Sequence, residues 1–467
     1  MLDRVLWRFV QSMKDYKLPR RELESLQARR LRRTLRLAYD NVPYYHDLMR
    51  QFGKVPSDLD ARGLKDFPVL TRRSVADNET QLVSRKARAW QPRGGSGTSG
   101  MFSWVMYDWG FRDLSNALQA RHYTMIGGRP WKRVVSIWSP TAYWRRSLSG
   151  ESQGKPTTWS EEMGLMALLG RLTKRSNFLL ASEDDPRQDL RRLLSMKPDI
   201  VMGRPSHLLK MSDFLPTEGR GIKVQAVECK HETFTETAKS TIEGAFGAKT
   251  FRSFGSAELG FAACECRFQT GIHLDEDWVL FEVLRDGERV GPGESGELVA
   301  TVLGNDAMPL IRYATGDTVE LSDEGRCSCG SSFTLMRRML GRSEDWLRTA
   351  AGTLVNPLEV AEFVEGKLGM RDYQIVQRKT DDFVVKTRSP GPDEALLAEA
   401  LRGYLSEMVG TRVNLSFTTR PSEDTWLKNR PVVCACAKAE AAEGCPRGPT
   451  DSASWLKKAR HRLTSAP

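Results

Sequence analysis

The chain contains no long hydrophobic run. Its apolar-rich stretches, such as Trp278 to Leu284, fall far short of the roughly 20 residues that a transmembrane helix needs. The first residues, Met1-Leu2-Asp3-Arg4, also lack the basic start, apolar core and small-residue cleavage site of a signal peptide. We therefore expect no transmembrane segment and a cytoplasmic location.

Cysteine is sparse, with eight residues in a chain of 467. In a cytoplasmic protein these few cysteines are not expected to form a disulfide framework, so clustered ones are read as metal ligands or plain thiols. No internal repeat is evident. The length exceeds what one compact core normally uses, which predicts two or three domains.

Positive charge is in excess, with a net charge of +11 and a pI near 9.3. Such a balance favours anionic partners: nucleic acid, an acidic membrane surface or phosphorylated small molecules. The densest basic stretch, Arg20 to Arg36, has leucines at spacings of three to five and predicts an amphipathic helix with a solvated basic face. No nucleic-acid-binding motif accompanies it, so we expect no nucleic-acid partner.

The order of periodic segments predicts the architecture. Residues 1 to about 60 are predicted to be helical, with a break at Asn41-Val42-Pro43. Between about 130 and 260, strand-like and helical runs alternate, which is typical of an α/β layered fold. Residues 277–320 read as antiparallel strands, and the order after Gly341 is α-β-β-α-β.

We therefore predict an α/β protein with a large N-terminal domain of layered sheets over residues 1–340. A small, mobile α+β C-terminal lid domain would span residues 341–433. The remaining residues, 434–467, are rich in Ala, Ser, Gly and charge and are expected to be disordered.

Two short segments near this junction suggest a nucleotide site. Asp317 follows a Thr-Gly turn in Arg312-Tyr313-Ala314-Thr315-Gly316-Asp317, and a carboxylate there is suited to gripping a diol such as ribose. Arg342, in Gly341-Arg342-Ser343-Glu344-Asp345, stands where a guanidinium can reach an anion between two lobes. Together they suggest a nucleotide held in a cleft.

A glycine-rich segment, Gly94-Gly95-Ser96-Gly97-Thr98-Ser99-Gly100, is a second candidate. Glycines allow backbone amides to turn toward an anion, and Ser and Thr hydroxyls add donors. No Lys follows as in a P-loop, and a flexible surface loop is the plain alternative.

A third candidate is Phe254-Gly255-Ser256-Ala257-Glu258, after a strand-like run. The Glu258 carboxylate is suited to Mg²⁺, which prefers oxygen ligands. A strand-end turn with a surface glutamate is the alternative.

Taken in order, these pieces resemble the adenylate-forming superfamily of acyl-CoA synthetases, and within it the phenylacetate–CoA ligase family and its capsular polysaccharide biosynthesis relatives. The resemblance runs from about Leu26 to Val433. Besides the segments above, it rests on Ala38-Tyr39-Asp40-Asn41-Val42-Pro43-Tyr44-Tyr45, Phe67-Pro68-Val69-Leu70-Thr71 and Pro198-Asp199-Ile200.

The resemblance implies an AMP-forming acid–thiol ligase that uses ATP and Mg²⁺. A carboxylic acid would form an acyl-adenylate, and CoA would then take the acyl group while the small domain changes position between the two steps. The resemblance implies that Ser96, Gly97, Thr98, Ser99 and Gly100 bind the ATP phosphates and that Gly255 and Ser256 help to bind the nucleotide. It implies that Glu258 binds Mg²⁺, that Asp317 binds the ribose, and that Arg342 contacts the nucleotide at the hinge. Glu344 or Asp345 would be the pivot about which the small domain turns.

A lysine of the small domain normally offsets charge in the adenylation step of such enzymes. Lys428, in Thr425-Trp426-Leu427-Lys428-Asn429-Arg430, is the match, although the family usually has Gly where this chain has Leu427. A surface lysine in a loop is the alternative. The phosphate loop also departs from the family, since Met101-Phe102 follow it.

Cysteines and a histidine suggest a metal site. Cys264-Glu265-Cys266 is followed by His273 and much later by Cys327-Ser328-Cys329. One His and three Cys fill a closed tetrahedral Zn²⁺ site, and some members of the family have a similar, structural arrangement. We expect Cys266, His273, Cys327 and Cys329 as ligands, with unmetallated buried thiols as the alternative.

Two other functions remain open. The acyl-adenylate could pass to an amine in polysaccharide or secondary-metabolite biosynthesis, or the chain could be a non-catalytic scaffold that keeps the fold.

Overall fold

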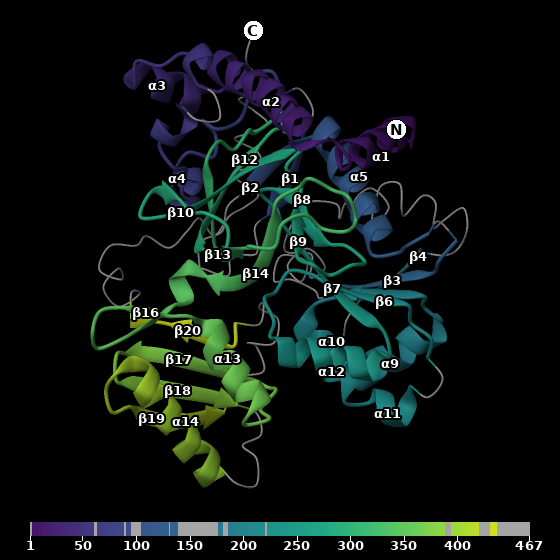
Figure 1. Cartoon of the computed structure of the whole chain (residues 1–467), viewed down its shortest axis with the longest axis vertical. Helices are drawn as coiled ribbons and strands as arrows, with labels where there is room; N and C mark the ends of the chain where they lie inside the picture. The colour runs from purple at the N-terminus through teal and green to yellow at the C-terminus, as the bar shows by residue number, and fades with distance from the viewer. Residues whose placement is uncertain are drawn as a thin grey trace, which may run out of the picture.

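The computed structural model describes residues 2–59, 63–87, 90–94, 104–129, 131–138, 176–180, 185–219, 222–387, 394–419 and 430–436. Within them, N-terminal helices lie at one end of the molecule, a long mixed sheet crosses the middle, and a small α+β unit lies at the other end (Figure 1). The predicted α/β class with a small C-terminal unit is confirmed.

The central sheet has twelve strands in the order β11-β10-β12-β13-β14-β9-β8-β7-β6-β5-β3-β4. It changes from parallel to antiparallel at β7, which pairs parallel with β6 and antiparallel with β8. The parallel strands are β3 (Val134–Trp138), β4 (Ser176–Leu180), β5 (Ile200–Gly203), β6 (Ala226–Cys229) and β7 (Lys249–Ser256). The antiparallel strands are β8 (Gly260–Glu265), β9 (Ile272–Leu274), β10 (Val279–Arg285), β11 (Glu288–Arg289), β12 (Ser295–Val302), β13 (Tyr313–Leu321) and β14 (Leu335–Arg342).

Helices cover the parallel half and bury its apolar strands. They are α9 (Pro186–Ser195), α10 (Pro205–Ser212), α11 (Leu215–Glu218) and α12 (Glu236–Phe246). Helix α12 begins where the Thr235 hydroxyl accepts a hydrogen bond from the Ala238 amide, and it ends at Gly247, whose φ of +62° is the left-handed conformation that favours glycine. Ile242 faces the sheet from this helix and is fully buried.

The N-terminal helices are α1 (Leu2–Asp15), α2 (Arg20–Asn41), α3 (Pro43–Gln51) and α4 (Arg72–Asp77), and α5 (Trp109–Met125) follows the hairpin of β1 (Trp90–Gly94) and β2 (Trp104–Asp108). The predicted break is confirmed: Val42 is extended, as a residue before proline prefers, and Pro43 starts the next helix. Helix α5 begins at Asp108, whose carboxylate accepts from the Phe111 amide at 2.8 Å.

A fully buried ion cluster fixes α5 against the antiparallel half of the sheet. Arg121 pairs with Asp275 at 2.7 Å and with Asp277 at 2.8 Å, and His122 lies 2.7 Å from Asp275. Because a buried charge without its partner costs several kcal/mol, these contacts hold α5 in one position. The acids belong to the turn between β9 and β10, so the cluster also fixes the neighbourhood of His273.

The small unit follows β14. It contains α13 (Pro357–Gly366), α14 (Glu394–Val409) and a sheet of β19 (Asn414–Thr419), β18 (Asp382–Thr387), β17 (Tyr373–Lys379) and β20 (Val432–Cys434), and β15 (Leu347–Arg348) pairs with β16 (Leu354–Val355) near the hinge. The predicted α-β-β-α-β order is confirmed, but β20 is an addition. Cys434 is the last residue of this strand and is buried beside Gln377. The predicted start of the tail at residue 434 was therefore wrong by at least one residue.

Candidate functional site

Asp317 and Arg342, the two residues singled out near the junction, lie side by side on neighbouring strands. They are register partners of β13 and β14, and the Arg342 guanidinium is 3.2 Å from the Asp317 carboxylate. Arg342 also donates to the carbonyl of Thr315 at 2.8 Å. The Asp317 side chain keeps 11% of its surface exposed and that of Arg342 keeps 21%, so both can reach a ligand.

The turn before Asp317 is fixed by its own side chains. The Thr315 hydroxyl donates to the carbonyl of Leu298 at 2.9 Å and accepts from the Asp317 amide at 3.1 Å. Gly316 has a φ of +76°, and a Cβ there would lie 3.2 Å from an Arg342 nitrogen. The Thr-Gly pair therefore holds the Asp317 carboxylate in one direction while leaving room for Arg342.

Glu258 is buried, with 3% of its surface exposed, so the alternative of a surface glutamate is wrong. It follows β7 and accepts a hydrogen bond from the Tyr313 hydroxyl at 3.1 Å, and Arg72 lies 3.4 Å from the same oxygen. Burial, and next to it the charge of Glu258, raise the pKa of Tyr313 well above its usual value. Tyr313 therefore stays protonated and serves as a donor.

Gly255 and Ser256 build the turn that presents Glu258. A Cβ on Gly255 would lie 2.4 Å from the carbonyl of Gly260, so only glycine fits this close approach. The Ser256 hydroxyl accepts from the amides of Glu258 and Leu259, each at 3.2 Å. Both residues thus have a structural role in positioning the carboxylate.

Strand β13 joins the two acids into one site. It carries Tyr313 beside Glu258 and, four residues on, Asp317. Burial alone would lower the pKa of Arg72, but its interactions with Tyr313, Glu258 and Asp317 outweigh this effect and the net shift is upward. Arg72 therefore lies within electrostatic reach of both carboxylates.

Arg72 and Tyr313 were not selected from the sequence as site residues. Arg72 begins α4, directly after the segment Phe67-Pro68-Val69-Leu70-Thr71. The chain there bridges the first residue of β13, with a bond from the Leu70 amide to the Arg312 carbonyl at 2.8 Å. In the sequence, the only indication that Arg72 belongs to the site was its position directly after that segment. The contact with Glu258, 186 residues away, is a tertiary fact that no local pattern carries.

The hairpin that carries the glycine-rich segment is anchored beside Glu258. The Tyr107 hydroxyl donates to the carbonyl of Ala257 at 2.8 Å, and Glu79 accepts from the Trp104 amide at 2.9 Å. Residues Gly94 and Trp104 are register partners at the end of the hairpin. Ser96, Gly97, Thr98, Ser99 and Gly100 themselves lie outside the described residues, as does Lys428.

The hinge segment is held by an arginine close to Lys428 in the sequence. Arg430 lies 2.8 Å from Asp345 and 3.1 Å from Glu344. Burial raises the pKa of Asp345, although Arg430 opposes this. The two acids expected at the pivot are therefore tied to the end of the segment that contains Lys428.

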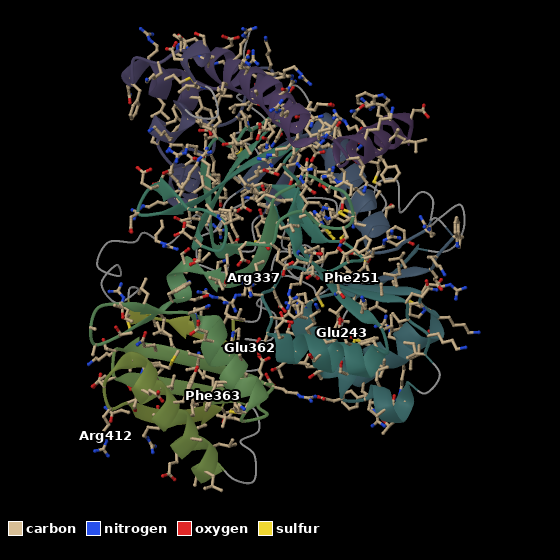
Figure 2. The ribbon with its side chains drawn as sticks, viewed as in Figure 1. Glu243, Phe251, Arg337, Glu362, Phe363 and Arg412 are labelled. Carbon is tan, nitrogen blue, oxygen red and sulfur yellow. The ribbon has the colours of Figure 1, made fainter. Side chains whose placement is uncertain are left out.

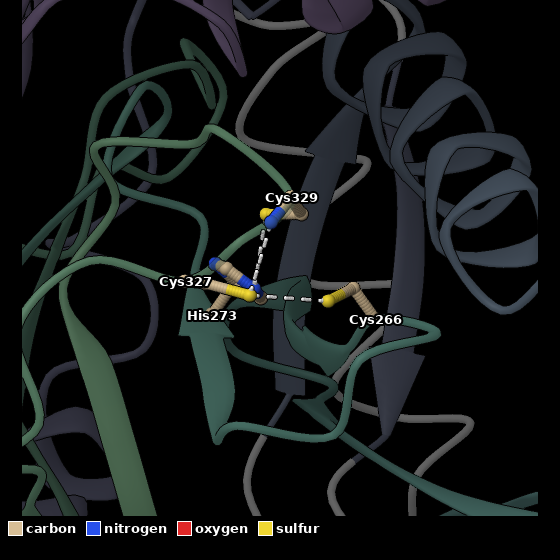
Figure 3. Close-up of side chains that lie close together, drawn as sticks. All are labelled: Cys266, His273, Cys327 and Cys329. Atoms are coloured by element: carbon tan, nitrogen blue, oxygen red, sulfur yellow. Dashed lines mark hydrogen bonds between the residues drawn. The ribbon is translucent and has the colours of Figure 1, made fainter.

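The four expected metal ligands come together (Figure 3). Their ligand atoms, from Cys266, His273, Cys327 and Cys329, all lie within 4.8 Å of one another. The sulfur atoms of Cys266 and Cys327 are 3.5 Å apart, and the Cys329 sulfur is 3.6 Å from His273 Nε2. A tetrahedral zinc with bonds of about 2.3 Å places its ligand atoms about 3.8 Å apart, so the spacing fits that ion.

The surroundings of the cluster also suit a metal. Burial lowers the pKa of His273 to about 4, which keeps its imidazole neutral as coordination requires. The Tyr16 hydroxyl lies 2.9 Å from the Cys329 sulfur. Cys264 is fully buried and donates instead to the carbonyl of Glu265, so it stands apart from the cluster as expected.

The chain is similar to known proteins over most of its length. The chain is 28% identical over 379 residues to a phenylacetate-coenzyme A ligase of Thermus thermophilus, covering 78% of the chain and 80% of that relative. Protein CapK of Staphylococcus aureus is 20% identical over 413 residues, 85% of each chain. No family model matches.

Among solved structures, a 2-hydroxyisobutyryl-CoA ligase in the postadenylation state superposes with a TM-score of 0.73 at 17% identity, covering 97% of this chain and 94% of that one. The chain has the fold of the adenylate-forming CoA ligases. Against the same ligase in its thioesterification state the TM-score is 0.61. The backbone thus follows the postadenylation arrangement more closely. The resemblance to the phenylacetate–CoA ligases and their capsule relative is confirmed.

Proposed function

We propose that this chain activates a carboxylic acid with ATP and transfers the acyl group to CoA. The observation that carries the proposal is the arrangement along β13, where Asp317 pairs with Arg342 and Tyr313 bonds Glu258. An acid suited to a ribose, an arginine at a domain junction and a buried acid suited to a cation thus lie on or beside one strand, β13, of a CoA ligase fold.

In the first step a carboxylate oxygen of the acid attacks the α-phosphorus of ATP, and pyrophosphate leaves. Asp317 would accept hydrogen bonds from the ribose hydroxyls, and Arg342 would bind the nucleotide from the hinge. Glu258 would contribute one carboxylate oxygen to Mg²⁺, an ion that neutralises phosphate charge when bound. The loop residues Ser96 to Gly100 would hold the phosphates, and Lys428 would offset charge at the new mixed anhydride.

In the second step the CoA thiol, after losing its proton, attacks the acyl carbon and AMP leaves with the bonding electrons. The small unit would turn about Glu344 and Asp345 between the steps. The bond between Arg430 and Asp345 supports this assignment, because Arg430 is only two residues from Lys428 in the sequence and so links that lysine's segment to the pivot.

We propose that Cys266, His273, Cys327 and Cys329 hold a structural Zn²⁺. The ligands come from the end of β8, from β9 and from the loop before β14. Four protein ligands leave no open position, so the ion would support folding and take no part in the reaction. A cytoplasmic location also stays a prediction.

The test is pyrophosphate release from ATP by the full chain, measured across a panel of aryl and aliphatic carboxylic acids. The proposal expects release that depends on one class of acid and, with CoA added, formation of a thioester and AMP. Release that proceeds with an amine but not with CoA would favour amide synthesis. Absence of acid-dependent release across the panel, with ATP binding absent by calorimetry, would identify a scaffold.

A further inference from the structure

A groove on the outer side of α2 collects positive charge at the end of the molecule opposite the small unit (Figure 1). It has a volume of about 480 Å³, and the charged side chains that line it are exposed. These include Arg29, Arg32, Arg33, Arg36, Lys86 and one acid, Asp40. The proposed reaction uses none of them.

The arginines form a stripe because of their helical spacing. Positions 29, 32, 33 and 36 are related by three, four and seven residues and share one side of α2. Residues 25–39 contain no acid at all. Like charges three or four apart destabilise a helix, by about 0.2–0.5 kcal/mol per pair, so helix stability gives no reason for the stripe.

Most of this charge has no acidic partner within the described part of the chain. Arg33 pairs with Asp306, whereas Arg32 bonds only the carbonyl of Ala28. No ion pair involves Arg29, Arg36 or Lys86 among the residues described. The groove therefore offers several guanidinium groups to an external anion.

An apolar stripe lies on α1, the helix that precedes α2. Helix α1 packs Val5 against α5 but exposes Leu6, Trp7 and Val10 by 49%, 63% and 44%. These three residues lie on the outer side of the helix, and Trp109, at the start of the neighbouring α5, is 41% exposed. Single exposed apolar residues are ordinary, but three on one short helix are not scattered.

Contacts of Arg33 and Asp306 connect the groove to the start of α5. Asp306, the partner of Arg33, donates its amide to the Asp108 carboxylate at 2.6 Å, and Asp108 immediately precedes Trp109. Arg8 of α1 lies within electrostatic reach of Asp108, Asp306 and Arg33. Arg8 of α1, Arg33 of α2 and the start of α5 thus lie close to one another.

We propose that this surface binds the anionic face of a lipid bilayer, with lipid phosphates in the arginine groove and Trp7, Leu6 and Val10 at the headgroup boundary. A basic face beside exposed Trp and Leu is the pattern of helices that lie in the membrane interface. An anionic bilayer can satisfy both parts of this surface, because its phosphates can pair with the guanidinium groups and its apolar region can bury the indole. A nucleic acid would leave the apolar stripe without a partner, which is why the bilayer is favoured.

The test is co-sedimentation of the full chain with vesicles of phosphatidylcholine alone and of phosphatidylcholine mixed with phosphatidylglycerol. Binding is expected to the mixed vesicles only and to fall at high salt. A variant with Arg29→Gln, Arg32→Gln and Arg36→Gln should bind on the order of 100-fold more weakly, since each basic side chain near an anionic surface contributes about fivefold. Trp7→Ser should weaken binding independently of salt.

The matched control removes the same charge elsewhere. Lys367→Gln, Lys379→Gln and Arg412→Gln change three exposed residues of the small unit, where Figure 2 shows Arg412 at the outer edge. Its binding should stay within about twofold of the parent chain. All variants should keep the parent's circular dichroism and pyrophosphate release, so failure of the proposed reaction leaves this test intact.

Three outcomes would overturn the proposal. They are no binding to the mixed vesicles, an equal loss in the control variant, and release of the bound protein by RNA or free CoA at concentrations that occupy the groove. The last would assign the groove to a soluble polyanion.

Discussion

Glu362 of the small unit caps the first turn of α12 in the large unit, and its carboxylate accepts from the Thr237 hydroxyl at 3.1 Å and from the Thr237 amide at 3.4 Å. The Glu236 amide donates to the other oxygen. A carboxylate is favourable at a helix N-terminus because it meets unpaired amides and the positive end of the dipole. Figure 2 shows Glu362 on the side of the small unit that faces α12.

Replacing Glu362 by Ala should loosen this contact. The loss of charge-assisted bonds to two amides is worth about 1–2 kcal/mol. Hydrogen exchange at the amides of Glu236 and Thr237 should therefore speed up by about 5- to 30-fold. Glu399→Ala, at an exposed position of α14, is the control and should leave both amides unchanged. Equal protection in the Glu362 variant would show that the cap does not hold the units together.

Asp317→Ala tests the ribose assignment. Hydrogen bonds to a charged group are worth about 1.5–3 kcal/mol, so the Michaelis constant for ATP should rise about 10- to 100-fold. The dependence on the acid should change little. Asp323→Ala is the control, since that side chain is 63% exposed and distant from Arg342 in sequence. A folded Asp317 variant with the parent's ATP dependence would remove the basis of the nucleotide site.

Much of this arrangement could be predicted from the sequence, because local patterns determine it. A few consecutive residues predict each of three features. These are the Thr-Gly turn before Asp317, the helix break at Pro43, and the alternation of strands and helices in the parallel half of the sheet. The contacts that complete the site are not predicted in this way. Arg72 and Glu258 are 186 residues apart in the sequence, and Glu362 and Thr237 are 125 residues apart. Because the partners are so distant in the chain, no local sequence pattern predicts either contact.

Removal of one metal ligand should release the zinc and destabilise the large unit. Cys327→Ser should lower the zinc content of the purified chain from about one per molecule to well below one. The substitution should lower the free energy of unfolding, measured with denaturant, by more than about 4 kcal/mol. Loss of a structural metal is among the most destabilising effects that a single mutation has. Cys264→Ser, at a buried cysteine outside the cluster, should keep the zinc. Parent protein without zinc by elemental analysis would contradict the assignment.

Glu79 gives a prediction about pH. Burial raises the pKa of its carboxyl to about 7, although the bond from the Trp104 amide opposes this. The folded state therefore holds this proton more tightly than the unfolded chain, whose carboxyl titrates near 4.5. The stability linked to Glu79 is complete below about pH 4.5 and is lost as the pH rises through 7.

Glu79→Gln should consequently stabilise the protein at pH 8 and have little effect at pH 5. Glutamine keeps an oxygen for the Trp104 amide but carries no charge. Because the side chain is partly exposed, the gain at pH 8 should be about 1–2 kcal/mol, less than the full shift would give. Thermal unfolding of both proteins from pH 5 to pH 8 measures it, with exposed Glu407→Gln as the control. A gain that is the same at both pH values would show that the charge of Glu79 does not cause it.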